Sequence, residues 1–163
     1  MIFAMAEGHT RRQARDNPEV AMLSVQQLLE QKPKGIFSVQ PDDPVITAIR
    51  KMAEHHIGAL LVMTGDKLVG IVSERDYARK VVLLGRSSTE TRVAEIMTSK
   101  VITVTPKQDA HDCMRLMTDK RIRHLPVVTG ERVIGVLSIG DLVRAVIEEQ
   151  ERTIADLETY IRS

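Results

Sequence analysis

Apolar and polar residues follow a pattern along the chain that changes from a helical to a strand period and back. Apolar positions at spacings of three and four predict an amphipathic helix over residues 45–55. Residues 59–63 are continuously apolar and predict a buried strand, and residues 67–72 return as the second strand of a hairpin after a glycine turn. A short strand at residues 36–39 and a helix at 74–82 complete a β-α-β-β-α unit.

The same unit occurs twice. Residues 35–82 align with residues 100–147 without a gap at an offset of 65, and fourteen of the 48 aligned positions are identical. The second copy predicts a strand at 101–104, a helix at about 108–119, strands at 123–128 and 132–137, and a final helix from about residue 139. A unit this small buries too little surface to be stable alone. We therefore expect the copies to share a core and any ligand to lie between them.

The fold class predicted is α/β (α+β), with five segments along the chain. They are a mobile leader (1–21), the first repeat with a preceding helix at 25–31 (22–84), a linker (85–99), the second repeat (100–147) and a C-terminal helix extension (148–163). We expect Asp42-Asp43-Pro44 to cap the helix of the first repeat, with the proline in its first turn.

The last helix carries a second apolar stripe that continues beyond the repeat. Its members lie 3.5 to 3.6 residues apart on average and are interrupted by Gln150: Val143, Ile147, Ile154, Leu157 and Ile161. Such a stripe packs either onto its own domain or against a second copy of the chain.

Composition narrows the possible functions. The 23 Lys and Arg residues balance 22 Asp and Glu, and there are two Phe, two Tyr and no Trp, which disfavours nucleic-acid binding. The chain has no apolar run of about 18 residues, so no membrane span is expected. The single Cys113 aligns with Ala48 and is expected to be a small buried residue. A lone thiol and a short apolar N-terminus without signal-peptide character favour the cytoplasm.

Both copies close with Gly-x-x-Ser-x-x-Asp, at residues 70–76 and 135–141. Serine followed three residues later by an acid is typical of a capping box, which is a purely structural role. The same position also suits a ligand, because a helix N-terminus offers free N–H groups to phosphate and a carboxylate can accept hydrogen bonds from ribose hydroxyls. The residues alone leave both interpretations open.

These features together resemble a tandem pair of cystathionine β-synthase-type (CBS) domains over about residues 25–148. The resemblance rests on the doubled unit, both copies of the motif, the lead-in Ala94-Glu95-Ile96-Met97-Thr98, and the string Arg123-His124-Leu125-Pro126-Val127-Val128. The residue strings at 73–80 and 124–127 are similar to stand-alone bacterial CBS-pair proteins. The resemblance implies a Bateman module, in which pseudo-twofold symmetry creates two clefts for adenosine-containing ligands.

The resemblance also implies which residues line the clefts. In the first cleft Asp76 would hold the ribose, next to Ser73 and Arg75, with the base near Ile36, Ser38, Ala59, Leu60 and Leu61. The second would use Asp141 and Ser138, with the base near Val101, Thr103, His124, Leu125 and Pro126. Arg75 and Arg123 are candidates for phosphate contacts, with Lys120 and Arg121 as further positive charge nearby. The alternative for each is a solvated basic edge or a surface ion pair. Leu61 stands where the second copy has Pro126, so the two base pockets should differ.

No metal site or catalytic centre is expected. His55 and His56 point about 100° apart on a helix, and no set of ligands completes a site. His124 is expected to be a pH-sensitive neighbour of the second cleft, because no nucleophile pairs with it.

The function expected is that of a non-catalytic regulatory module. It would sense AMP, ADP, ATP or NAD as effectors, form a homodimer and act on an unknown downstream protein, with no nucleic acid and no membrane as partner. The first alternative is an interaction scaffold whose clefts are vestigial, and the second is a nucleotide-hydrolysing enzyme.

Overall fold

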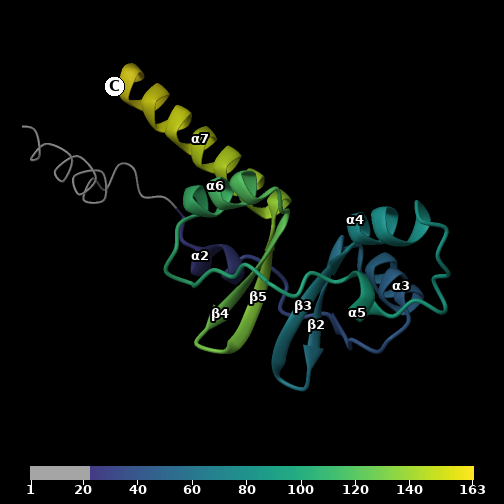
Figure 1. Cartoon of the computed structure of the whole chain (residues 1–163). Helices are drawn as coiled ribbons and strands as arrows, with labels where there is room; N and C mark the ends of the chain where they lie inside the picture. Colours follow the sequence, from purple (N-terminus) through teal and green to yellow (C-terminus); the bar gives the residue numbers. More distant parts are fainter. Residues whose placement is uncertain (1–22) are drawn as a thin grey trace, which may run out of the picture.

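Two β-hairpins, each flanked by helices, form the centre of the molecule (Figure 1). The structure is a computed structural model that describes residues 23–163, so the leader expected at residues 1–21 lies outside the described range. It confirms the expected α/β fold of two related repeats.

The first repeat contains a three-stranded sheet in the order β1-β2-β3, in which β1 and β2 are parallel and β2 and β3 antiparallel. Helix α4 continues directly into a π-helical turn, Ala78–Val82. The elements are α2 (Val25–Glu30), β1 (Ser38–Val39), α3 (Val45–His55), β2 (Ala59–Thr64), β3 (Lys67–Ser73) and α4 (Glu74–Tyr77).

The second repeat keeps the hairpin and both helices. Its closing helix is much longer than that of the first repeat and runs almost to the end of the chain (Figure 1). The elements are α5 (Val93–Ile96), α6 (Ala110–Lys120), β4 (His124–Thr129), β5 (Arg132–Ser138) and α7 (Ile139–Arg162).

The strand expected at residues 101–104 is absent, because one of its partners is a proline. In the first repeat, Leu61 N–H donates to the carbonyl of Phe37 at 3.3 Å. The aligned residue in the second repeat is Pro126, which has no N–H to donate. Only Val104 remains paired, in an isolated parallel bridge to Val127.

The expected cap of α3 is also wrong. Pro44 occupies the cap position and makes no side-chain bond to the helix. The carboxylate of Asp43 instead accepts from Gln40 N–H at 2.8 Å. The linker backbone satisfies the first turn of α3, since Val45 N–H donates to the carbonyl of Thr91 at 2.8 Å. The linker is therefore fixed against the first repeat.

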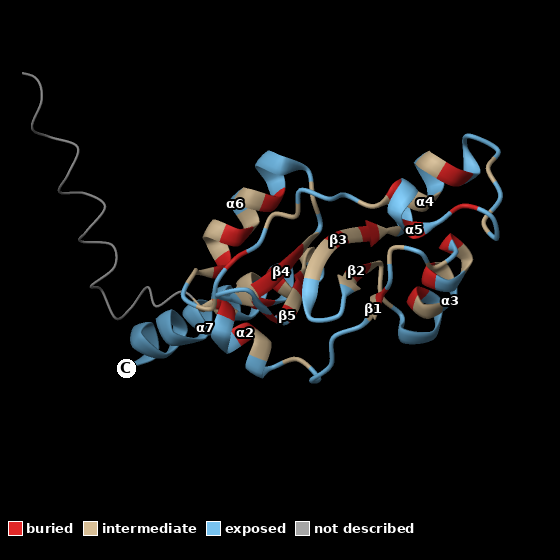
Figure 2. Cartoon of the chain, turned by 60° about the horizontal axis from the view of Figure 1, so that its bottom comes forward, coloured by how far each residue is buried: buried red, intermediate tan, exposed pale blue. Residues whose placement is uncertain are grey.

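The repeats exchange their leading helices. Helix α2 precedes the first repeat, yet its Val25 and Leu28 are buried in the core of the second. Helix α5 precedes the second repeat, and its Val93 and Ile96 are buried in the core of the first. Figure 2 shows the buried residues in the hairpins and on the helix faces turned toward them. Because each repeat completes the core of the other, the two fold as one unit.

This exchange explains the glycine of the Gly-x-x-Ser-x-x-Asp motif. A Cβ on Gly70 would lie 2.6 Å from Sδ of Met97 and 3.1 Å from the carbonyl oxygen of Thr98. A Cβ on Gly135 would lie 2.7 Å from Cδ2 of Leu29. In both repeats the segment contributed by the other repeat passes too close for a side chain.

The prediction for Cys113 is confirmed. Cys113 and the aligned Ala48 are both fully buried, each in the core of its repeat. Burial raises the pKa of the thiol to about 11, and the charges of Asp109 and Asp112 add to the effect. The thiol is therefore protonated and inert at neutral pH.

The first interpretation of the C-terminal stripe, packing onto its own domain, is wrong. Leu142 and Ala145 of α7 are buried against the second repeat, whereas the stripe from Val143 to Ile161 is exposed.

Candidate functional site

Both motifs form complete capping boxes at the start of the closing helices. Ser73 N–H donates to Oδ2 of Asp76 at 2.9 Å, and Asp76 N–H donates to Oγ of Ser73 at 3.2 Å. Ser138 and Asp141 repeat this arrangement at 2.8 and 3.2 Å. The capping interpretation of the motif is thus confirmed. Each cap uses the Oδ2 atom, which leaves Oδ1 outside the cap.

The first motif opens into a cavity between the repeats, which we call cleft A. It has a volume of about 330 Å³ and contains Ser73 and Asp76 on one wall and Val101 and His124 on the other. The full lining is Gly58, Ala59, Ile71, Ser73, Glu74, Arg75, Asp76, Arg79, Thr98, Lys100, Val101, Ile102, Arg121, Ile122, Arg123 and His124.

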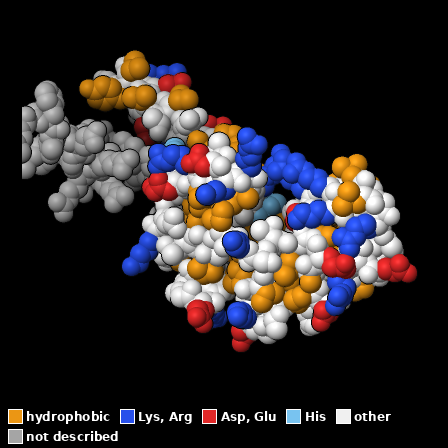
Figure 3. All heavy atoms as spheres, in the orientation of Figure 1, with side chains coloured by type: hydrophobic (Ala, Val, Ile, Leu, Met, Phe, Trp, Pro, Cys, Tyr) orange, Lys and Arg blue, Asp and Glu red, His pale blue; other side chains and the backbone are white. Residues whose placement is uncertain are grey.

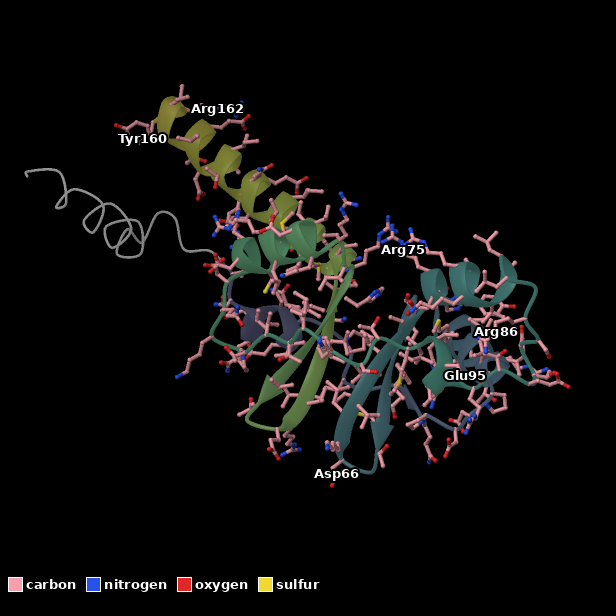
Figure 4. The ribbon with its side chains drawn as sticks, in the orientation of Figure 1. Asp66, Arg75, Arg86, Glu95, Tyr160 and Arg162 are labelled. Atoms are coloured by element: carbon pink, nitrogen blue, oxygen red, sulfur yellow. The ribbon has the colours of Figure 1, made fainter. Side chains whose placement is uncertain are left out.

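Cleft A is surrounded by positive charge. Five of its lining residues are cations from both repeats, Arg75, Arg79, Lys100, Arg121 and Arg123, against two acids. Figure 3 shows Lys and Arg side chains gathered where the two halves meet, and Figure 4 shows Arg75 at this junction. Among the described residues, none of the five takes part in an ion pair within 4.0 Å.

The second motif lines a larger cavity, cleft B, of about 1280 Å³. Its walls come from the α2–β1 connection, the end of α3 and strand β5. The rings of Phe37 and His55 stack with centroids 3.9 Å apart in this wall. Cleft B also contains Ile36, Ser138 and Asp141. It is wider than cleft A and its wall is more aromatic.

In cleft B, Lys32 forms an ion pair with Asp141, the acid of the second motif. Lys32 Nζ lies 2.7 Å from Oδ2 of Asp141 and donates to the carbonyl of Val136 at 2.7 Å. Burial alone would raise the pKa of Asp141, but the hydrogen bonds from Lys32 and Ser138 outweigh it and hold the pKa below its ordinary value. At the first motif the corresponding cation is Lys80, which does not line cleft A and whose Nζ lies 3.3 Å from the other oxygen, Oδ1, of Asp76.

The Lys32–Asp141 pair predicts an acid-dependent loss of stability. The pKa of Asp141 is lower in the folded state than in the unfolded state. The ionised carboxylate therefore stabilises the fold at pH values above its unfolded pKa, and this stabilisation is lost as the pH falls through its pKa in the folded state. Lys32→Met should lower the free energy of unfolding by about 1 kcal/mol at neutral pH. The deficit relative to the parent should shrink in acid, as measured by urea denaturation across pH. Lys34→Met, on the same connection, is the control, and a deficit that does not change with pH would contradict this role of the pair.

His124 lies at the contact between the two clefts and contributes to both. Burial lowers its pKa, and the charges of Lys32 and Arg123 lower it further against the opposing effect of Asp141. At neutral pH the imidazole is therefore uncharged. A Cβ on Gly58, which also lines both clefts, would lie 3.5 Å from Cε1 of His124.

The structure corrects how the predicted residues are grouped. Ile36 lies in cleft B with Asp141 and not with Asp76, whereas Val101 lies in cleft A. The reason is the exchange of leading segments, because Thr98 pairs with Ile71 of β3 and carries the following residues along the first repeat. Ser38 and Thr103 line neither cleft, and Thr103 is exposed.

Four residues predicted near the bases are part of the interior instead. Leu60, Leu61, Leu125 and Pro126 are buried and line neither cleft. They lie in strands β2 and β4, each of which has three consecutive buried residues, so both faces of the hairpin are covered there. Ala59, Arg75, Arg121 and Arg123 do line cleft A, together with the motif residues.

Several lining residues were not predicted from the sequence. Arg79 was detectable, because it lies one helical turn after Arg75. Lys100 and Lys32 gave no local signal, since the exchange of leading segments brings them to the clefts.

Within residues 23–163, no group of three or more His, Cys, Asp or Glu residues gathers to hold a metal ion. In the same range, no helix has the length and apolar character needed to cross a membrane.

Comparison with known proteins identifies the repeats. The family model described as CBS domain matches residues 33–83 and 93–148. The CBS domain-containing protein CBSX3, mitochondrial, of Arabidopsis thaliana is 48% identical over 126 residues, which cover 74% of this chain and 61% of that protein. The chain thus spans less than two thirds of this curated relative.

Solved structures agree with this assignment. A protein with CBS domains from Burkholderia ambifaria MC40-6 is 56% identical, with a TM-score of 0.76 and coverage of 78% of this chain and 96% of that chain. The CBS domain protein NE2398 is 49% identical, with a TM-score of 0.75 and coverage of 78% and 99%. With two matched repeats that build one α/β unit, the chain belongs to the CBS domain family, as a tandem pair of CBS domains.

Proposed function

We propose that this CBS pair is a non-catalytic sensor that binds adenine nucleotides, such as AMP, ADP, ATP or NAD, in its clefts. The observation that carries the proposal is cleft A. There the acid of the motif lies beside five cations that make no ion pair with the described part of the chain. A group with both hydroxyls and phosphates satisfies this arrangement.

In cleft A the nucleotide would lie across the repeats. Its ribose hydroxyls would donate to Oδ1 of Asp76, which the capping box leaves available apart from the contact with Lys80. The phosphates would lie toward Arg75, Arg121 and Arg123, which belong to different repeats. A ligand that joins both repeats stabilises one arrangement of the two halves, which is how occupancy would reach a partner protein.

Cleft B would favour a less charged adenosine ligand. Lys32 already neutralises Asp141, and the stacked Phe37 and His55 rings offer an aromatic wall for a base. Lys32 contacts Oδ2 of Asp141, the oxygen that also accepts from Ser138 N–H, so a ribose would bind Oδ1 of a carboxylate whose charge is already neutralised. The two clefts are therefore proposed to differ in ligand and in affinity.

The wider proposal keeps the expectations from the sequence. The protein would form a homodimer through the helices that follow the motifs and act on a downstream protein, without catalysis. The cytoplasm stays a prediction, and the Arabidopsis relative is named as mitochondrial.

An arginine variant tests the phosphate assignment. Arg123→Ala should weaken ATP binding roughly 10-fold to 100-fold, because it removes a charge-assisted hydrogen bond. Adenosine binding should change far less, as measured by calorimetry. Arg132→Ala, in the exposed end of β5, is the control. Equal losses for ATP and adenosine would contradict the assignment.

The two rival functions give different results in the same experiments. A scaffold with vestigial clefts shows no thermal shift with any adenosine ligand, whereas a ligand at 100 times its Kd stabilises a fold by about 2.7 kcal/mol. An enzyme releases product from ATP on incubation, and that product disappears in Ser138→Ala.

A further inference from the structure

The outer face of α7 is an apolar surface without a partner in the chain. Val143, Ile147, Ile154, Leu157 and Ile161 are between 41 and 80% exposed. From residue 150 onward every residue is exposed, and α7 extends away from the body in Figures 1 and 2. Figure 4 places Tyr160 and Arg162 at the far end of the helix, clear of both repeats.

A helix that projects this far needs a partner. The 24 residues of α7 make a rod of about 36 Å, and its residues 150–162 are all exposed and receive no support from the repeats. Isolated helices shorter than about 12 to 15 residues are marginal in water. Packing along an apolar face is what stabilises such helices in proteins.

The stripe has the spacing of a coiled coil. Its positions follow one another at intervals of four, three, four, three and four residues, which is a heptad repeat. The three isoleucines, Ile147, Ile154 and Ile161, fall at position a, while Val143, Gln150 and Leu157 fall at position d. In parallel coiled coils, isoleucine at a with leucine at d favours two strands, and Leu157 is the leucine at d here.

The polar and charged residues favour the parallel arrangement. In a parallel pair in register, the Gln150 amides at position d face each other and can form a hydrogen bond, whereas a shifted register would bury each amide against an apolar layer without a partner. The flanking positions g and e place Val146 opposite Glu151 and Thr153 opposite Glu158. No like charges meet across this interface.

An antiparallel pair of the same layers fits less well. It would bring Arg144 opposite Glu158, which is favourable. However, it would place Glu151 opposite Glu151 of the second copy and bury the Gln150 amide against Ile154. A buried amide without a partner and a central pair of like charges both disfavour this arrangement.

We propose that residues 143–161 of α7 form a parallel two-stranded coiled coil with α7 of a second copy of this chain. The proposal rests on the homodimer of the proposed function and specifies its arrangement. The second repeats of the two copies would lie at the same end of the coiled coil, and Gln150 would set its register.

The first test is the mass of the full chain by light scattering after size exclusion. The parent should be a dimer at micromolar concentration, and truncation after Glu149 or the Ile154→Glu variant should give monomers. Arg152→Glu, at the outward position f, should stay dimeric. If the truncated chain remains a dimer, the coiled coil is wrong, and the homodimer and nucleotide proposals stand. If the parent is monomeric, both the homodimer of the proposed function and the coiled coil are wrong.

The second test distinguishes parallel from antiparallel strands. Under mild oxidation Leu157→Cys should form a disulfide-linked dimer, because position d faces its own copy, whereas Thr159→Cys at position f should not. The native Cys113 does not interfere, since it is fully buried. A dimer that depends on residues 150–163 but gives no Leu157→Cys cross-link would overturn the parallel arrangement. Nucleotide titration of the truncated chain reports on the clefts independently.

Discussion

Asp76→Asn is expected to weaken nucleotide binding in cleft A roughly 10-fold to 100-fold, the equivalent of losing a hydrogen bond to a charged group. Asparagine preserves the size of the side chain and an oxygen that can still accept from Ser73 N–H, so the cap survives. It replaces the second oxygen with an NH₂ group, which cannot accept from a ribose hydroxyl. Calorimetry with ATP measures the change.

The matched control is Asp141→Asn, which makes the same change in cleft B. It should leave the tighter ATP site of cleft A intact, because that site is formed by the first motif and by residues 98–102 and 121–124. The free energy of unfolding of each variant shows that the capping box still forms. If Asp76→Asn binds ATP as well as the parent, the carboxylate holds no ribose and only caps its helix.

Gly70→Ala should lower the free energy of unfolding by about 2 to 3 kcal/mol, which is the upper part of the range for overpacked sites. The new methyl group would lie 3.1 Å from the carbonyl oxygen of Thr98. That carbonyl accepts a hydrogen bond from Ile71 at 3.0 Å and cannot move without breaking the pairing between the repeats. Urea denaturation measures the loss.

Gly135→Ala provides the comparison at the aligned position. Its nearest neighbours within 4 Å are the methyl groups and Cγ of Leu29, a side chain that can adopt another rotamer. We expect a loss of about 1 kcal/mol for this variant. If the two variants lose the same stability, or if neither loses any, the close approach of the exchanged segment is not the reason for the motif glycine.

The hairpins and the amphipathic helices could be predicted from the sequence because their signals are local. The apolar run of β2, the glycine turn and the spacing in α3 each specify an element within a dozen residues. The strand expected at 101–104 failed for a reason that lies elsewhere in the chain. Pro126 has no N–H to donate to this segment, and the consequence could be predicted only if the pairing of residues 101–104 with β4 were already known.

The composition of the clefts was less predictable because it depends on contacts between distant segments. The sequence predicted the motif residues and three of the four arginines around cleft A, but it missed Arg79 and assigned Ile36 and Val101 to the wrong clefts. Because α2 packs in the core of the second repeat and α5 in that of the first, the segment after α2 faces the second motif and the segment after α5 faces the first. The contact between Lys32 and Asp141 joins residues 109 positions apart and had no signal in the sequence.

The most direct test of the central claim is a calorimetric titration of the unmodified chain with ATP, ADP, AMP and adenosine at two salt concentrations. We predict saturable binding, with ATP tighter than adenosine and its affinity reduced by salt, because the cations of cleft A contact the phosphates. Absence of binding by all four ligands at millimolar concentration would contradict the account.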